Sequence, residues 1–271
     1  MFAPSVAKSL KDYYNASDDY LIRLKCSAEG SVRAYSSVLA KVAGSDSKVL
    51  DLGCGPGIST ALVAEMGPWA CGMDISLLFL MATGRKDLPF VQGDITSLPF
   101  ATDSFDVVGL RATLEHVPEV ETLVDEVIRV LRLGGWLVIF SPNLLSPFTP
   151  LRAVGNYLMR RTKIETPFYN SISSALLYSL EGFIRLTRKR LTRNASLEFR
   201  RPSLDQTGRD FDSVFMSNQV DMEKLLEAQG FELSNLAEGE GRIGRFLARM
   251  FPYYSGGIGI TAEKRITSSG G

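Results

Sequence analysis

Three glycines stand close together in the segment Val49-Leu-Asp-Leu-Gly-Cys-Gly-Pro-Gly-Ile-Ser-Thr60, which begins as a hydrophobic strand. Gly53, Gly55 and Gly57 allow the backbone to turn sharply and to approach a ligand with no Cβ in the way. A helix is expected to begin within a few residues, and the N–H groups of its first turn have no partner inside the helix. The segment is therefore a candidate ligand-binding loop, although glycines at this spacing could also serve a tight turn alone.

The spacing of these glycines differs from that of two common phosphate-binding loops. The dinucleotide pattern G-x-G-x-x-G would need a third glycine where Ile58 or Thr60 stands. The P-loop pattern G-x-x-x-x-G-K-S/T does not occur in the sequence. A nucleotide-dependent oxidoreductase is therefore disfavoured. A glycine loop without Lys or Arg suits a nucleoside ligand that carries no phosphates.

Two carboxylates follow the next two predicted strands. Asp74 comes 21 residues after Gly53, and Asp94 lies in Gln92-Gly-Asp-Ile95. A carboxylate at the first of these strand ends can accept hydrogen bonds from both hydroxyls of a ribose. The second could accept one from an adenine amino group. Both aspartates could instead cap the helices that follow them, because Asp is a favourable N-cap residue.

The only histidine and the cysteines complete the reactive side chains. His116 lies in Thr113-Leu-Glu-His-Val117, after the fourth predicted strand, and a near-neutral pKa would suit it to act as a general base. It could equally pack beneath a pocket or bind a backbone carbonyl. Cys54 is read as a small filler of the glycine loop, with a reactive thiol as the alternative. The cysteines lack metal or disulfide spacing, so no metal site is predicted.

These residues can meet only if alternating strands and helices position them. The runs that read as buried strands are 48–52, 70–73, 89–92, 105–110 and 135–140. Helical periodicity separates several of them and is clearest over 120–133. Such alternation predicts parallel βαβ units with helices on both faces of the sheet. Because ligands of open α/β sheets bind at the carboxyl ends of the strands, the glycine loop and both carboxylates are expected at one edge.

The alternation of predicted strands and helices is absent from two ranges of the chain. Residues 1–47 contain an amphipathic helical pattern near 31–43 and are predicted to form an N-terminal helical cap. Residues 142–215, rich in Pro, Ser, Tyr and Arg, are predicted to be a helical, basic cap insertion. The pattern then resumes with a helix over 220–229 and strands over 231–236 and 257–266. The predicted core is therefore 48–141 together with 216–266.

Charge excludes some functions and points to one region. The chain has 30 Lys+Arg and 30 Asp+Glu, and this balance argues against a nucleic-acid binder. The absence of a secretory or membrane-spanning pattern favours the cytoplasm. The insertion, counted over 151–215, has 12 basic and 6 acidic residues. Within the insertion, the basic stretch 152–201 with its helix over 175–191 could contact a membrane surface. Alternatively, the helix could cover an acceptor as a lid, recognise an acidic acceptor, or simply pack on the domain.

Five segments stand in the order and spacing found in class I S-adenosylmethionine (SAM) methyltransferases: DLGCGPG, MDIS, QGDITSLPF, FDVVGLRATLEHV and EVIRVLRLGGWLVI. The chain most resembles the type-11 group, which includes quinone C-methyltransferases, closely over 48–141 and loosely at the ends. The resemblance implies an α/β fold: a three-layer Rossmann-like sandwich with a seven-stranded, mostly parallel sheet, an antiparallel last strand and a helical cap insertion.

The resemblance also implies how SAM is bound. Asp51 and the backbone around Gly53 would hold the methionine end, although Asp51 could serve only to orient the loop. Asp74 would bind the ribose hydroxyls. The remaining cofactor-binding residues expected are Cys54, Gly55, Gly57, Ile75 on the adenine face, Asp94 with the N–H of Ile95 on the adenine edge, and Arg111 near the amino-acid portion.

The function implied is methyl transfer by in-line displacement to a small-molecule or lipid-like acceptor, with His116 as the candidate base. Tyr13, Tyr14 and Tyr20 near the N-terminus are expected to close over the cofactor. The alternative is a non-catalytic SAM-binding or membrane-associated interaction protein, which an intact glycine loop does not exclude.

Overall fold

The structure is a computed structural model of the chain and describes residues 4–16, 18–25, 29–159, 163–164, 166–205, 210–235, 246 and 249–265. The helices are α1 (Pro4–Ala16), α2 (Asp18–Lys25), α3 (Glu29–Ala43), α4 (Ile58–Glu65), α5 (Leu77–Met81), the 3-10 turn η1 (Leu114–His116), α6 (Val120–Val130), α7 (Phe148–Leu158), α8 (Ile172–Leu191) and α9 (Gln219–Ala228). The strands are β1 (Lys48–Leu52), β2 (Trp69–Asp74), β3 (Phe90–Gln92), β4 (Phe105–Arg111), β5 (Leu131–Pro142), β6 (Phe231–Asn235) and β7 (Gly257–Lys264).

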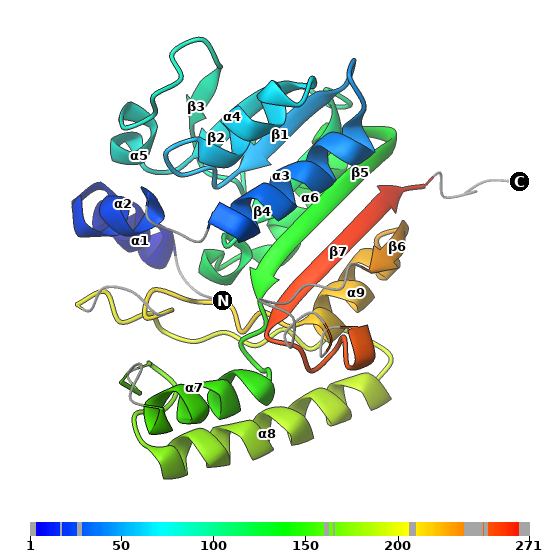
Figure 1. The fold of residues 1–271 in the computed structure, drawn as a ribbon. Helices are drawn as coiled ribbons and strands as arrows, with labels where there is room; N and C mark the ends of the chain where they lie inside the picture. Colours follow the sequence, from blue (N-terminus) through cyan, green and yellow to red (C-terminus); the bar gives the residue numbers. More distant parts are fainter. Residues whose placement is uncertain are drawn as a thin grey trace, which may run out of the picture.

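The seven described strands form one sheet in the order β3-β2-β1-β4-β5-β7-β6 (Figure 1). Parallel pairing runs from β3 through β2, β1 and β4 to β5. β7 pairs antiparallel with both β5 and β6, so it is the one described strand that runs against the rest. The predicted seven-stranded, mostly parallel sheet with an antiparallel last strand is confirmed. The expected strand ends at 236 and 266 lie outside the described residues.

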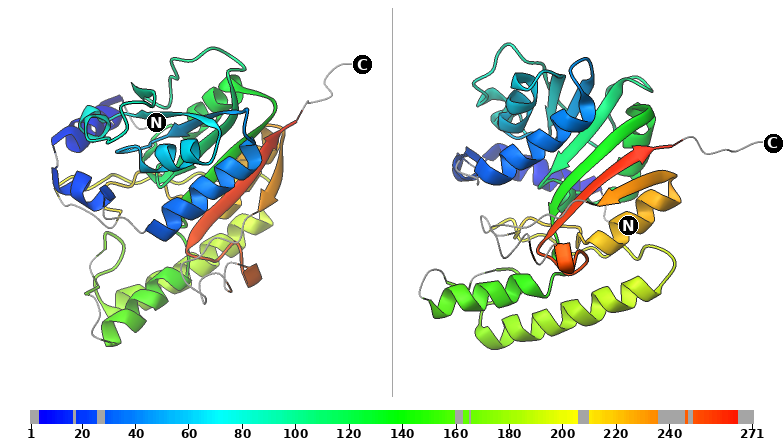
Figure 2. Two further views of the ribbon diagram at one scale, coloured as in Figure 1. Left: turned by 45° about the horizontal axis from the view of Figure 1, so that its top comes forward. Right: turned by 45° about the vertical axis from the view of Figure 1, so that its right-hand side comes forward.

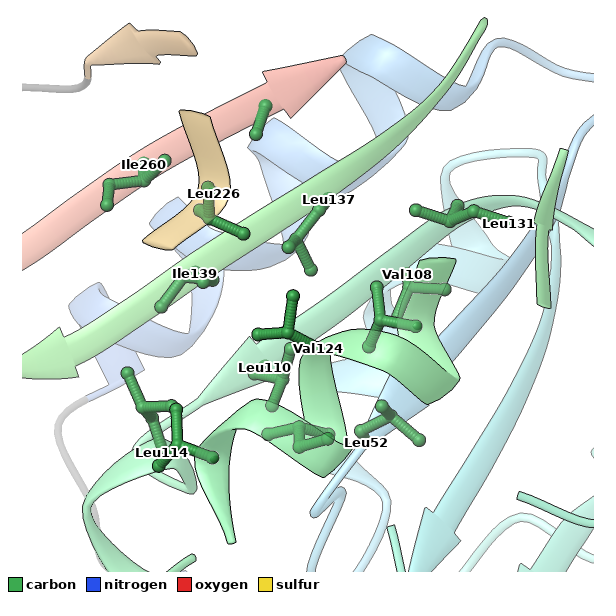
Figure 3. Close-up of a cluster of buried hydrophobic side chains, with 14 of the residues drawn as sticks. Leu52, Val108, Leu110, Leu114, Val124, Leu131, Leu137, Ile139, Leu226 and Ile260 are labelled. Carbon is green, nitrogen blue, oxygen red and sulfur yellow. The ribbon is translucent and has the colours of Figure 1, made fainter. Parts of the chain in front are cut away.

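Helices cover both faces of this sheet, α3 and α4 on one side and α6 and α9 on the other (Figures 1 and 2). Successive strand residues point to opposite faces. Val49 therefore packs with α3 and α4, while Leu50 and Leu52 face the larger core under α6 and α9 (Figure 3). A parallel sheet that is buried on both faces needs continuous apolar runs, which these strands have. The predicted three-layer sandwich is confirmed.

The predicted boundary between the helix over 120–133 and the strand over 135–140 is wrong. The helical pattern over 120–133 predicted a helix to Leu133, but α6 ends at Val130. Leu131 has an extended backbone and pairs with Phe105 as the first residue of β5. Its side chain is fully buried there, so a strand residue supplied the last apolar position of the apparent helical pattern.

The N-terminal range 1–47 divides between two places. α1 and α2 lie beside the carboxyl edge of the sheet, whereas α3 lies flat on its face (Figure 1). Tyr35 and Leu39 of α3 are fully buried against β-strand residues such as Val107 and Val138. α3 is therefore one of the helices of the sandwich layer, although it falls within the range predicted as a cap.

The insertion 142–215 begins with a helical hairpin of α7 and α8, which lies beyond the carboxyl edge of the sheet (Figure 2). α8 begins with a capping box, in which Ser171 and Ser174 each bind the other's backbone. A small residue, Gly182, lets α8 approach the preceding loop, because a Cβ there would lie 2.4 Å from the carbonyl oxygen of Leu145. After α8 the chain returns along the sheet edge to α9.

The basic end of α8 is tied to the core by a buried cation. Lys189 is 6% exposed, and its Nζ lies 2.7 Å from Oδ2 of Asp221 and 2.9 Å from Oε1 of Glu198. Asp221 itself is buried in α9 and also accepts hydrogen bonds from the backbone of Ser196 and the side chain of Asn218. Part of the insertion's positive charge is therefore used inside the fold.

Replacing this cation is expected to destabilise the protein. Lys189→Met would leave the Asp221 carboxylate buried without its charge partner, which costs about 3–5 kcal/mol. Urea denaturation monitored by circular dichroism measures the loss. Arg188→Met, at the exposed neighbouring position, is the matched control and should change stability by less than about 0.5 kcal/mol. Equal midpoints for the two variants would contradict a stabilising role of the ion pairs.

Candidate active site

A cavity lies at the carboxyl edge of the sheet, between the loop after β1, the ends of β2 and β4, and the helices α1 and α2. Of the residues predicted to bind the cofactor or to act as base, it is lined by Gly53, Cys54, Gly55, Asp74, Ile75, Asp94, Ile95, Arg111 and His116. Asp51 and Gly57 do not line it. The structure thus brings nine of the eleven predicted site residues to one cavity.

The glycine loop has the backbone conformation for which glycine is needed. Gly53 has a φ of +67°, and a Cβ there would lie 2.2 Å from Oγ1 of Thr113. The N–H groups of Gly53 and Cys54 both donate to the carbonyl oxygen of Met73, at 2.8 and 3.1 Å. Gly57, with a φ of +77°, is the N-cap residue of α4. The loop therefore does more than turn the chain, because it is held against β2 at the cavity wall.

Asp51 is buried behind this loop. Its Oδ1 accepts a hydrogen bond from Tyr35 at 2.7 Å, and its Oδ2 accepts from Ser59 at 2.6 Å and Thr60 at 2.7 Å. Burial raises the pKa of Asp51, and the three hydroxyl donors partly offset this. These contacts fix the loop and the start of α4. Asp51 therefore orients the loop, and its direct contact with a methionine group stays a prediction.

Asp74 is held at the cavity by two backbone hydrogen bonds. Its Oδ2 accepts from the N–H of Gly55 and its Oδ1 from the N–H of Ser76, each at 2.8 Å. Each carboxylate oxygen has two lone pairs, so each can accept one further hydrogen bond from a ligand in the cavity. Burial raises the pKa of Asp74, and the backbone N–H groups of Ser76, Gly55 and Ile75 partly offset this. The N-cap of α5 is Ser76, so Asp74 does not serve as a helix cap.

Asp94 and Ile95 present an acceptor and a donor side by side. Oδ1 of Asp94 accepts from the N–H and the hydroxyl of Thr96, at 2.9 and 2.7 Å, in a turn that no helix follows. Within the described part of the chain, no hydrogen bond reaches Oδ2 of Asp94 or the N–H of Ile95. An adenine edge offers the complementary pair, an amino donor beside a ring-nitrogen acceptor.

Arg111 and Cys54 both line the cavity and interact electrostatically with Asp51. The positive charge of Arg111 lowers the pKa of Asp51, which favours the ionised carboxylate. Burial, together with the negative charge of Asp51, raises the pKa of Cys54 well above its ordinary value. The thiol therefore stays neutral and fills space, which fits the simpler of its two interpretations. Cys26 lies outside the described residues, and no group of three metal-ligating side chains occurs among those described.

His116 lies between two carboxylates. Its Nδ1 is 3.4 Å from Oδ2 of Asp212, and its Nε2 is 3.6 Å from Oε1 of Glu115. Burial lowers the pKa of His116, but the negative charges of Asp212 and Glu115 outweigh it, and the net shift is upward from 6.5. The imidazole is therefore a stronger base than an exposed histidine would be.

Sequence reasoning did not identify the two carboxylates that face His116. Asp212 is 3% exposed and comes from the end of the insertion, 96 residues after His116. Glu115 is adjacent to His116, accepts a hydrogen bond from Ser141 at 2.9 Å, and is also buried. The only sequence signal for Asp212 was the pair of aspartates in Arg209-Asp-Phe-Asp212. The spacing of this pair matches no motif that predicts a functional site. An acidic residue next to the sole histidine was the available signal for Glu115.

The N-terminal tyrosines gather at the same cavity. The rings of Tyr13, Tyr14 and Tyr20 have centroids 5.2–6.0 Å apart, and Tyr14 and Tyr20 line the cavity. The hydroxyl of Tyr14 donates to Oδ2 of Asp212 at 2.8 Å. α1 is thus hydrogen-bonded to Asp212, the carboxylate that faces Nδ1 of His116. Closing of these rings over a bound cofactor stays a prediction.

Comparison with known proteins agrees with this geometry. The family model described as a methyltransferase domain, type 11, matches residues 50–139. A demethylmenaquinone methyltransferase from Mycobacterium sp. (strain JLS) is 44% identical over 123 residues, which are 43% of this chain and 51% of that protein. The same enzyme from Renibacterium salmoninarum is 33% identical over 159 residues, 56% and 66% of the two chains. The matches thus span about half to two thirds of these relatives.

Two solved structures share the fold. A protein from Listeria monocytogenes, assigned as a SAM-dependent methyltransferase, has a TM-score of 0.55 and 18% identity, over 88% of this chain and 100% of that one. A SAM-dependent methyltransferase from Mesorhizobium loti has a TM-score of 0.50 and 16% identity, over 86% and 96%. These structures share the fold, while the family match and the similarity to the demethylmenaquinone methyltransferases show that the chain belongs to the class I SAM-dependent methyltransferases of the type-11 group.

Proposed function

We propose that this protein transfers the methyl group of SAM to a small, lipid-like acceptor by in-line displacement. The observation that carries the proposal is one cavity that holds both Asp74, with lone pairs left for a ribose, and His116 between two carboxylates. A cofactor site and a proton acceptor in the same cavity are what such a transfer requires.

The residues present fit SAM. Asp74 would bind the ribose hydroxyls, Asp94 and Ile95 the adenine edge, and the backbone around Gly53 with Arg111 the amino-acid end. When bound, SAM supplies a methyl group on a sulfonium sulfur, which is already strongly electrophilic. The chain's own residues then need mainly to hold the acceptor in line and to exclude water.

An acceptor with a hydroxyl must also lose its proton, and His116 is placed to take it. A phenolic hydroxyl has a pKa near 10, so at neutral pH it needs a base to become nucleophilic. The carboxylates of Asp212 and Glu115 would stabilise the imidazolium that forms. Catalysis then depends on the insertion, which supplies Asp212.

The acceptor is proposed to be a quinone-like molecule. The lining of the cavity also includes apolar and aromatic side chains, among them Leu10, Tyr14, Tyr20, Leu24 and Val117. The relatives named above are demethylmenaquinone methyltransferases, and this supports an aromatic acceptor ring. An acceptor with a lipid-like tail would be met at a membrane, so peripheral membrane contact through the insertion 152–201 is part of the proposal.

Calorimetry with SAM, followed by a radiolabelled methyl-transfer assay with a short-tailed quinol, tests the proposal. We expect one SAM site and transfer to the quinol. SAM binding without transfer to the quinol or to extracted lipids would favour the alternative of a non-catalytic SAM-binding protein. A protein that does not bind SAM would contradict both interpretations.

The role of Asp212 predicts a shift in pH dependence. If His116 is the base, kcat/KM rises with pH as the imidazolium loses its proton. Asp212→Asn removes a negative charge 3.4 Å from Nδ1, so the pKa of His116 falls and the rise moves to lower pH. A pH–rate profile measures the shift. Asp205→Asn, at an exposed position of the same insertion, should leave the profile unchanged. The same midpoint in both variants would contradict the coupling of Asp212 to the base.

A further inference from the structure

α8 exposes the side of the helix that carries its large apolar residues. The side that packs on the protein carries Ala175, Ser179, Gly182, Leu186 and Lys189. The opposite side is exposed, with relative exposures of 49% for Leu176, 57% for Leu177 and Leu180, 40% for Ile184 and 84% for Leu191. The large apolar residues of this helix are therefore turned away from the protein.

These side chains form one continuous stripe. At 3.6 residues per turn, Leu176, Leu177, Leu180 and Ile184 fall within an arc of about 100° of the helix, and Leu191 continues the stripe. A rise of 1.5 Å per residue gives the stripe a length of roughly 22 Å. α8 lies on the outer side of α7 in Figure 1 and in the right-hand view of Figure 2. Tyr157 and Leu158 at the end of α7 are exposed as well. A patch of this kind marks an interaction surface.

The cations of the helix divide between the interior and the edges of the stripe. Lys189 is buried in its ion pairs, and Arg185 is paired with Glu198. Arg188 and Arg190 are exposed. By the helical repeat they lie on opposite sides of the stripe, about 160° apart. The side chain of Arg190 extends along the ring of Tyr253, with its Cζ 4.6 Å from the ring centroid.

No acidic side chain lies within the stripe, and Glu181, the one acidic residue of α8, falls on the far side of Arg188. An apolar stripe bordered by arginines complements a lipid bilayer with anionic headgroups. The apolar side chains can enter the acyl boundary while the guanidinium groups reach the phosphates. No helix of the described residues is long and apolar enough to cross a membrane.

We propose that this stripe, defined as Leu176, Leu177, Leu180, Ile184 and Leu191 with Arg188 and Arg190 at its borders, docks the protein on an anionic lipid surface. The inference rests on the proposed function in that a lipid-like acceptor is met there. The hairpin lies beyond the carboxyl edge of the sheet (Figure 2), and residues at that same edge line the active-site cavity. Docking would therefore hold the cavity near the lipid that contains the acceptor. The contact is mainly apolar, because several cations of the insertion are already paired.

Vesicle flotation tests the docking. The full chain is mixed with vesicles of phosphatidylcholine and phosphatidylglycerol, without SAM or acceptor, and we expect it to float with them. Leu177→Glu/Leu180→Glu places two charges in the stripe and should lower the bound-to-free ratio roughly tenfold or more. Leu133→Glu is the matched control, because Leu133 is 56% exposed near the start of β5, at the opposite edge of the sheet. This control should float like the unmodified protein.

Salt and lipid composition separate the apolar contact from a purely electrostatic one. We expect most of the binding to persist in about 500 mM salt, a concentration at which surface charges more than a few ångströms apart are largely screened from one another. Binding to pure phosphatidylcholine should be weaker but measurable. Absence of flotation with anionic vesicles at low salt would overturn the proposal. So would equal flotation of the double variant, or complete loss at high salt.

A second copy of the chain is the competing occupant of the stripe. Docking on lipid would be overturned if light scattering finds a dimer that the double substitution breaks, and if that dimer does not float with the vesicles. Transfer of the methyl group to a short-tailed, water-soluble quinol is measured on the same double variant and should be unchanged. Failure of the docking and failure of the methyltransferase activity are therefore distinguished.

Discussion

Asp74→Asn is expected to weaken SAM binding by at least about a hundredfold, because two hydrogen bonds from the ribose to a charged acceptor contribute about 1.5–3 kcal/mol each. The asparagine keeps the shape of the side chain but loses the charge and replaces one acceptor oxygen with an amide donor. The carboxylate now accepts hydrogen bonds from the backbone N–H groups of Gly55 and Ser76. The amide donor of the asparagine would face one of these two N–H groups. Isothermal calorimetry with SAM measures the change in Kd.

The control for this change must separate binding from folding. Asp46→Asn, in the exposed turn before β1, makes the same chemical change at the opposite edge of the sheet and should leave Kd unaltered. Circular dichroism of both variants checks that β2 and its neighbours are intact. A folded Asp74→Asn protein with the Kd of the unmodified chain would remove Asp74 as the ribose ligand.

Position along a parallel sheet made this part of the site predictable. Asp74 and Asp94 follow strands that are hydrogen-bonded neighbours, and parallel strands end at the same edge of a sheet. Their convergence with the glycine loop therefore follows from the order of strands and helices alone. The exact contacts do not follow from it. Asp51, the next-to-last residue of β1, turns its carboxylate towards Tyr35, Ser59 and Thr60, because those hydroxyls surround it.

The insertion shows where local patterns fail. Asp212 reaches His116 only because the chain returns along the sheet edge after α8, and no periodicity encodes that path. The orientation of α8 is a second case. Its hydrophobic periodicity left open whether the leucine-rich side packs on the domain or faces outwards, and Ala175, Ser179 and Gly182 let the opposite side approach the loop before α7 more closely. Close packing by small residues leaves little trace in a hydrophobic pattern.

His116→Gln is expected to lower kcat for methyl transfer about 10²–10⁴-fold at saturating SAM. Glutamine retains hydrogen-bonding capacity but cannot take up a proton near neutral pH. The Kd for SAM should change little, since the ribose, adenine and amino-acid ends are held by other residues of the cavity. Single-turnover kinetics with a labelled methyl group measure the chemical step, and calorimetry measures the binding.

The size of this effect depends on the acceptor's own acidity, and that dependence provides the control. With a more acidic phenol, whose proton is already lost in the assay buffer, the His116→Gln enzyme should regain much of its rate, because no base is then needed. Glu121→Gln, at an exposed position in the first turn of α6, should behave as the unmodified enzyme with both acceptors. An unchanged kcat in His116→Gln with a weakly acidic phenol would remove His116 as the base. An equal loss with both acceptors would show that the side chain positions the acceptor and does not take its proton.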